Sequence, residues 1–140
     1  MRFWDASAIV ALLVDEPSHP VLARALDDDA VMLVWWASPV ECVSALARRE
    51  RDGSLGEPAM RAALNRLRIL ADGWHEILPT RPLRTTAERM LRVHPLRAAD
   101  ALQLAAAAVA AEQDPGSLEF LCLDERLNRA ASKEGFHVLP

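Results

Sequence analysis

The sequence predicts an α/β protein with a mostly parallel central sheet of four to five strands, flanked by helices. Short apolar runs alternate along the chain with longer stretches of helical periodicity. One run, AVMLVW at 30–35, is apolar throughout, as strands buried on both faces usually are. No linker, repeat or low-complexity tract interrupts the 140 residues, so we expect one domain over 1–140.

The first predicted elements are a strand at 2–4 and a helix directly after it. Apolar residues recur every three to four positions in this helix, and Ser7 is its expected N-cap. The segment DEPSHP breaks the chain, 21–26 is helical, and the apolar run described above forms the second strand. Asp5 therefore lies where the first strand gives way to the first helix.

The segment SPVE predicts the start of the next helix. Ser38 is its expected N-cap, a proline follows at the first helical position, and Glu41 completes a capping box. The pattern ends near residue 51, a further helix is predicted over 57–70, and HEIL at 75–78 is a short strand.

The last third of the chain continues the alternation of helices and strands. Helical periodicity covers 80–92 and 97–112, and the second of these helices is rich in alanine and leucine. A strand over 119–123, a helix over 125–134 capped by a glycine, and a strand over 136–139 complete the prediction.

Composition and charge limit the classes of function. Hydrophobic residues make up 51% of the chain and the formal net charge is -4, which argues against a general nucleic-acid coat protein but not against an enzyme that acts on nucleic acid. Cys42 and Cys122 form no CxxC pair, and the four histidines have no zinc-ligand spacing. The apolar stretch at 6–14 is too short to span a bilayer. We therefore expect a water-soluble, cytoplasmic protein with reduced thiols and no membrane partner.

Four carboxylates lie where the apolar pattern does not explain them. Asp5 and Asp124 close predicted strands, while Glu41 and Asp100 lie in the first turns of predicted helices. Strand ends and the helix starts that follow them meet at one edge of a parallel sheet, so all four are expected at one rim. Asp100 lies in the almost wholly apolar helix RAADALQLAAAA, where an isolated carboxylate needs a partner or a metal ion.

Each acid also has a purely local explanation. Asp5 and Asp124 can each cap the helix that follows, and Glu41 can belong to a capping box. Asp100 can accept a hydrogen bond from Arg97, three residues earlier. Taken singly, none of the four acids indicates a site.

Their conjunction is stronger evidence, because clustered carboxylates repel. Two carboxylates about 5 Å apart repel by about 3 kcal/mol at an effective dielectric constant near 20, and a helix N-terminus relieves only about 0.3 to 1 kcal/mol. A cluster of three or four must therefore take up protons or bind a cation. Oxygen ligands favour a hard ion, Mg²⁺ or Mn²⁺, which supports metal-assisted phosphodiester hydrolysis.

At these residues the chain resembles the PIN-domain ribonucleases, specifically the VapC type of toxin from bacterial toxin-antitoxin pairs. The resemblance covers essentially the whole chain. It rests on four segments in order, FWDASAIVALL, SPVECVSALARRE, HPLRAADALQLAAAA and LCLDERLNRAASKEGFHVLP. It implies a PIN-like three-layer fold over a single PIN domain, 1–140.

The resemblance also implies roles for individual residues. Asp5, Glu41 and Asp100 would hold Mg²⁺, with Asp124 as a fourth acid that binds the metal directly or through water. Ser7 matches the small hydroxyl residue that follows the first acid and would order water or phosphate.

For two further positions, the sequence leaves the role undecided. Arg97 either steers RNA or pairs with Asp100. Cys122 lies two residues before Asp124, at a position where many members of the resembled family have a threonine. Whether Cys122 can hold Asp124 in position as a threonine would is therefore open.

The function implied is a Mg²⁺-dependent endoribonuclease that acts as a toxin and cleaves RNA to a 5′-phosphate and a 3′-hydroxyl. A homodimer and a cognate antitoxin protein are implied as well. The alternative is a catalytically silent PIN-like domain that serves as a protein- or RNA-binding module. The sequence does not identify the RNA target.

Overall fold

Five parallel strands form a single sheet at the centre of the protein. The computed structural model describes all 140 residues. The strands are β1 (Arg2–Trp4), β2 (Met32–Trp35), β3 (His75–Ile77), β4 (Glu119–Leu121) and β5 (His137–Leu139), in the spatial order β3-β2-β1-β4-β5. In the central strand Phe3 lies opposite Leu33 on one side and Phe120 on the other. The predicted sheet is confirmed, and every strand pair in it is parallel.

Seven α-helices connect these strands. They are α1 (Ala6–Leu13), α2 (His19–Asp28), α3 (Ser38–Arg51), α4 (Glu57–Gly73), α5 (Arg81–Val93), α6 (Ala98–Ala110) and α7 (Glu125–Lys133), with one 3₁₀ turn, η1 (Pro115–Ser117). The order matches the prediction, but α2 begins two residues before the predicted start and α4 ends three residues after the predicted end. No helix combines the length and the apolar character needed to cross a bilayer.

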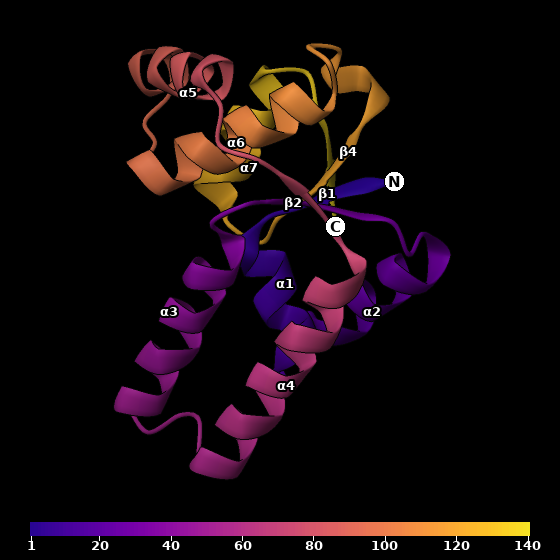
Figure 1. The fold of residues 1–140 in the computed structure, drawn as a ribbon, viewed down its shortest axis with the longest axis vertical. Coiled ribbons are helices and arrows are strands. Elements are labelled where there is room, and N and C mark those ends of the chain that lie inside the picture. The colour runs from indigo at the N-terminus through magenta and orange to yellow at the C-terminus, as the bar shows by residue number, and fades with distance from the viewer.

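The helices cover both faces of the sheet, which gives the expected three layers. Helices α1 to α4 lie below the sheet in Figure 1, and α5, α6 and α7 lie above it. Alternate strand residues enter two separate cores. Phe3 and Phe120 pack with α5, α6 and α7, whereas Trp4 and Leu121 pack with α1 to α4.

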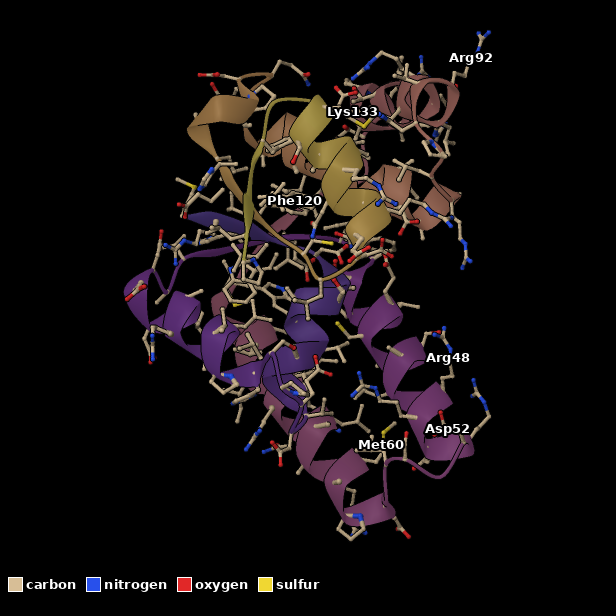
Figure 2. The ribbon with its side chains drawn as sticks, turned by 180° about the vertical axis from the view of Figure 1, so that it is seen from behind. Arg48, Asp52, Met60, Arg92, Phe120 and Lys133 are labelled. Carbon is tan, nitrogen blue, oxygen red and sulfur yellow. The ribbon has the colours of Figure 1, made fainter.

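Helices α3 and α4 form an antiparallel pair that extends away from the sheet (Figure 1). Met60, Ala63 and Leu67 of α4 are buried in the same core as Leu46 of α3. Asp52 lies at the far end of this pair, remote from Phe120 in the sheet (Figure 2).

Two helix starts differ from the prediction. The N-cap of α1 is Asp5, whose carboxylate accepts from the backbone N–H of Ser7, so Ser7 is not the cap. The N-cap of α3 is Ala37, and no side chain caps this helix, so the predicted Ser38 capping box is wrong. Ser38 lies inside the first turn and is fully buried, where its hydroxyl accepts a hydrogen bond from another helix. Glu41 is thereby left without a capping role.

The strand order places one crevice at the centre of the sheet. The chain runs outward from β1 through β2 to β3, then crosses back to add β4 and β5 on the other side of β1. The direction of winding therefore reverses between β1 and β4. In open parallel sheets, the carboxyl ends of the strands at such a reversal form the usual binding crevice. Asp5 follows β1 and Asp124 follows β4, so both lie at this point.

Candidate active site

The structure brings all four predicted acids and Ser7 to one cavity of about 370 Å³ at the carboxyl edge of the sheet. The cavity is lined by Asp5, Ala6, Ser7, Val10, Glu16, Glu41, Ala45, Arg49, Asp100, Leu123 and Asp124. The four predicted acids come from four different segments of the chain, and the apolar walls of the cavity come mainly from α1 and α3. Arg97 is not part of this lining and belongs to a neighbouring cavity.

Asp5 is held at the end of β1 by both backbone and side-chain contacts. Its backbone N–H donates to the carbonyl of Leu121 in β4 at 2.9 Å, which fixes the strand end. The side chain is only 5% exposed. Its Oδ2 atom accepts from the Ser7 N–H at 2.9 Å, from the Ser7 hydroxyl at 2.5 Å and from the Cys122 thiol at 3.5 Å. All of these contacts use one carboxylate oxygen.

Ser7 links Asp5 to the segment after β4. Its hydroxyl donates to Asp5 and accepts from the backbone N–H of Leu123 at 2.9 Å. The hydroxyl therefore fixes the orientation of the Asp5 carboxylate relative to the neighbouring strand. The predicted role of Ser7 in ordering water or phosphate remains a proposal.

Asp124 caps α7 and lies at the mouth of the cavity. Its Oδ1 atom accepts from the backbone N–H groups of Arg126 and Leu127 at 2.9 and 3.1 Å. The buried sulfur of Cys122 accepts from the Asp124 backbone N–H at 3.2 Å. The thiol of Cys122 thus contacts both Asp5 and the backbone of Asp124, so this residue supports the segment that carries Asp124.

Glu41 is oriented by a buried glutamine of α6. Gln103 is fully buried, and its side-chain amide N–H group donates to Ser38 Oγ at 2.9 Å and to Glu41 Oε1 at 3.2 Å. The Gln103 Oε1 atom has no hydrogen-bond partner. The amide therefore joins α3 to α6 at the floor of the cavity and holds one oxygen of Glu41.

Asp100 lies one turn before Gln103 on α6 and is half-buried. Arg97 is the N-cap residue of α6 and forms no ion pair with Asp100. Burial raises the pKa of Asp100, and the backbone N–H and the charge of Arg97 oppose that rise, so the two residues interact without a direct ion pair. Contact of Arg97 with RNA stays a proposal.

The electrostatics of the cavity disfavour the ionised forms of Asp5, Glu41 and Asp100. Burial raises the pKa of Asp5 and of Asp100, although the hydrogen bonds from Ser7 oppose the rise at Asp5. Burial also raises the pKa of Glu41 to about 7, and the negative charges of Asp5 and Asp100 add to this effect. Asp124 contributes in the same direction at Asp100. The acids therefore interact as one cluster.

The donor set fits a hard divalent cation. Asp5, Glu41 and Asp124 each use one carboxylate oxygen in the hydrogen bonds described above, and their second oxygens accept no hydrogen bond from the protein. Oxygen donors with unsatisfied negative charge are the ligands that Mg²⁺ and Mn²⁺ prefer. In the structure, no group of three or more acidic, histidine or cysteine side chains is close enough together to hold a metal ion. The fit therefore rests on the chemistry and placement of the donors.

Sequence reasoning missed a charged pair at the opposite wall of the cavity. Glu16 Oε2 and Arg49 Nη2 are 2.8 Å apart and join the end of α1 to α3. Arg49 lies two turns after Glu41 on one face of α3, a spacing that could have indicated it. Glu16 lies in the DEPSHP break, where no periodic pattern exists to place it.

Comparison with known proteins agrees with this fold. Residues 2–133 match the family model described as PIN domain. The chain is 38% identical to Ribonuclease VapC45 of Mycobacterium tuberculosis (strain CDC 1551 / Oshkosh) over 146 residues, covering 99% of this chain and 94% of the relative.

Solved structures show the same fold at lower identity. The crystal structure of Mycobacterium tuberculosis VapC20, a sarcin-ricin loop cleaving toxin, superimposes with a TM-score of 0.70 at 22% identity and covers 100% of both chains. FitAcB from Neisseria gonorrhoeae gives a TM-score of 0.65 at 18% identity, covering 100% of this chain and 97% of that one. The chain belongs to the PIN-domain family, among its VapC-type members.

Proposed function

We propose that this protein is a Mg²⁺-dependent endoribonuclease, with Mn²⁺ able to replace Mg²⁺, that acts as the toxin of a toxin-antitoxin pair. The observation that carries the proposal is the convergence of four carboxylates in one cavity, three of them with one oxygen bonded and the other free. Membership of the VapC-type family supports RNA as the substrate.

Asp5, Glu41 and Asp100 would hold the ion, and Asp124 would complete the set directly or through water. When bound, such an ion lowers the pKa of a coordinated water and neutralises charge on the scissile phosphate. Ser7 and Gln103 would keep one oxygen of Asp5 and of Glu41 fixed, so that the second oxygen is presented without reorganisation.

Removal and restoration of metal tests this proposal directly. We expect the metal-stripped protein to leave a panel of structured RNAs intact and to cleave at least one after Mg²⁺ is restored. Asp5→Asn and Asp100→Asn should abolish cleavage, because each removes a ligand charge while keeping the shape of the side chain. Asp72→Asn, at an exposed position near the end of α4, is the matched control and should cleave normally.

The same experiment separates the enzyme from the alternative function. If no RNA is cleaved with Mg²⁺ or Mn²⁺, and calorimetry detects no metal binding, the protein is a catalytically silent module that binds a protein or RNA partner. Normal cleavage by either site variant would instead refute the assignment of the ligands.

The proposed partners are RNA, a second copy of the chain and a cognate antitoxin protein, acting in the cytoplasm. Trp36 is 52% exposed and Val40 is 70% exposed at the start of α3, which supports a protein-covered surface near the cavity. Both cysteines are unpaired and buried, which suits a reducing compartment. Light scattering of the isolated protein tests the dimer, and co-expression with an adjacently encoded antitoxin tests the pairing by relief of growth arrest.

A further inference from the structure

A second cavity, of about 520 Å³, adjoins the acidic one on the side of α6 and α7. It is lined by Arg97, Ala99, Asp100, Asp124, Glu125, Arg126 and Arg129. Asp100 and Asp124 line both cavities, so the two share a wall. We refer to this second space as the arginine cavity.

The three arginines of the arginine cavity come from two helices. Arg97 is the N-cap residue of α6, and Arg126 and Arg129 lie one turn apart on α7. None of the three takes part in an ion pair, whereas Arg2, Arg49, Arg61 and Arg89 all do. Three arginines thus line one concave space, and none of them is paired with a carboxylate.

Three acids, Asp100, Asp124 and Glu125, line the arginine cavity beside its three arginines. Under the proposed function a metal ion would neutralise Asp100 and Asp124, which leaves three arginines against one uncompensated carboxylate. The lining then favours an anion over a base. Ala99 is its only apolar residue, and no aromatic side chain is present on which a base could stack. Guanidinium groups form bidentate hydrogen bonds with phosphate oxygens. No side chain caps the N-terminus of α6, so the backbone N–H groups of its first turn add positive potential. The chemistry matches a phosphodiester.

We propose that the arginine cavity binds the backbone phosphate next to the scissile phosphate of the RNA. The inference rests on the proposed ribonuclease function, because the shared wall of Asp100 and Asp124 would place the scissile phosphate between the two cavities. Phosphate contacts carry no sequence information, so this subsite fixes the position of the strand and not the choice of bases.

Binding measurements on an inactive protein test the proposal without interference from cleavage. The probe is a fluorescein-labelled single-stranded RNA of about 12 nucleotides, which is long enough to span both cavities. It is titrated with Asp5→Asn protein in Mg²⁺ at several KCl concentrations. Adding Arg126→Gln and Arg129→Gln should weaken binding about tenfold or more. The slope of log affinity against log salt should fall by about 1.4, since each lost contact to a single strand removes about 0.7.

Two further variants show whether charge or folding causes the effect. Arg126→Lys with Arg129→Lys keeps both charges and should restore the salt slope, with affinity remaining below that of the arginine protein because lysine lacks the planar fork. Arg92→Gln is the matched control, because Arg92 projects into solvent at the far end of α5 (Figure 2), and it should change neither quantity.

The outcomes separate this inference from the proposed function. Unchanged affinity and salt slope in the double glutamine variant would overturn the arginine cavity as a phosphate subsite, even if the protein cleaves RNA. A loss confined to one RNA sequence would overturn it too, because it would indicate base contacts. If the otherwise wild-type protein cleaves nothing with Mg²⁺ but the arginine variants lose affinity and slope as expected, the subsite stands and the proposed cleavage fails.

Discussion

Replacing Glu41 by glutamine should stabilise the metal-free protein. Burial and the charges of Asp5 and Asp100 raise the pKa of Glu41 to about 7, so ionised Glu41 is disfavoured in the folded state. Glutamine removes that charge and keeps the oxygen that accepts from the Gln103 amide at 3.2 Å. The substitution therefore isolates the electrostatic cost of the carboxylate from its hydrogen bond.

The sign and size of the effect follow from the pKa of Glu41. The unfolded chain ionises near the ordinary value of 4.5 and the folded protein only near 7, so folding stability falls as the pH rises between these values and is constant above them. At about 1.4 kcal/mol per pKa unit, the rise from 4.5 to about 7 gives an upper limit of about 3.5 kcal/mol. Because Glu41 is partly open to solvent, we expect the substitution to raise the free energy of unfolding by about 2 kcal/mol, which corresponds to a melting temperature higher by about 6 °C.

Thermal unfolding in EDTA measures this difference across pH. The variant should melt about 6 °C above the wild-type protein at pH 8, with the gap closing towards pH 4.5. Saturation with Mn²⁺ should reverse the order, since ligand at about 100 times its Kd stabilises the binding-competent protein by about 2.7 kcal/mol. Glu50→Gln, at an exposed position on the same helix, is the control. Equal melting temperatures of the Glu41 variant and wild type at pH 8 would refute the reasoning.

Three other perturbations should give measurable results. Gln103→Leu removes the hydrogen bond that favours ionised Glu41, so Mn²⁺ should bind only above a higher pH than in the wild-type protein. Calorimetry at several pH values measures this shift, and an unchanged pH profile would contradict the positioning role. Burial raises the pKa of Cys42 to about 12 and also raises that of Cys122, so mass spectrometry after iodoacetamide at pH 8 should show no adduct without denaturant and two with it. Glu134→Gln removes the ion pair with Arg89 and weakens the hydrogen bond with buried His94. The free energy of unfolding in urea should fall by about 1 to 2 kcal/mol, and by less at acidic pH because these contacts hold the pKa of Glu134 down.

The order of elements could be predicted because their patterns are local. The apolar run at 30–35, the proline-glycine break after α6 and the glycine at the end of α7 each mark a boundary within a few residues. The predicted N-cap of α3 is wrong because SPVE matches the capping pattern, whereas a tertiary contact fixes the role of Ser38. Its buried hydroxyl accepts a hydrogen bond from the amide of Gln103, which lies 65 residues away and is part of no local pattern.

The four acids could be predicted from their positions at strand ends and helix starts, but their supports could not. Gln103 differs from its alanine and leucine neighbours only in polarity, and the sequence does not show that α6 packs its amide against α3. The ion pair of Glu16 and Arg49 spans 33 positions and depends on how the end of α1 meets α3. Such contacts follow from packing between elements, which a single sequence does not encode in a readable form.

For Asp5 and Asp124 the local explanation and the functional one are compatible, because a carboxylate has two oxygens. At each residue one oxygen makes the capping bonds, and the other accepts no hydrogen bond from the protein. Burial disfavours the ionised form of Asp5, which is only 5% exposed, and the hydrogen bonds from Ser7 oppose that effect. At both residues the bonded oxygen fixes the position of the carboxylate, and the second oxygen is available to a ligand. Under the proposed function, the caps are therefore the reason that α1 and α7 can begin with ligands of the metal.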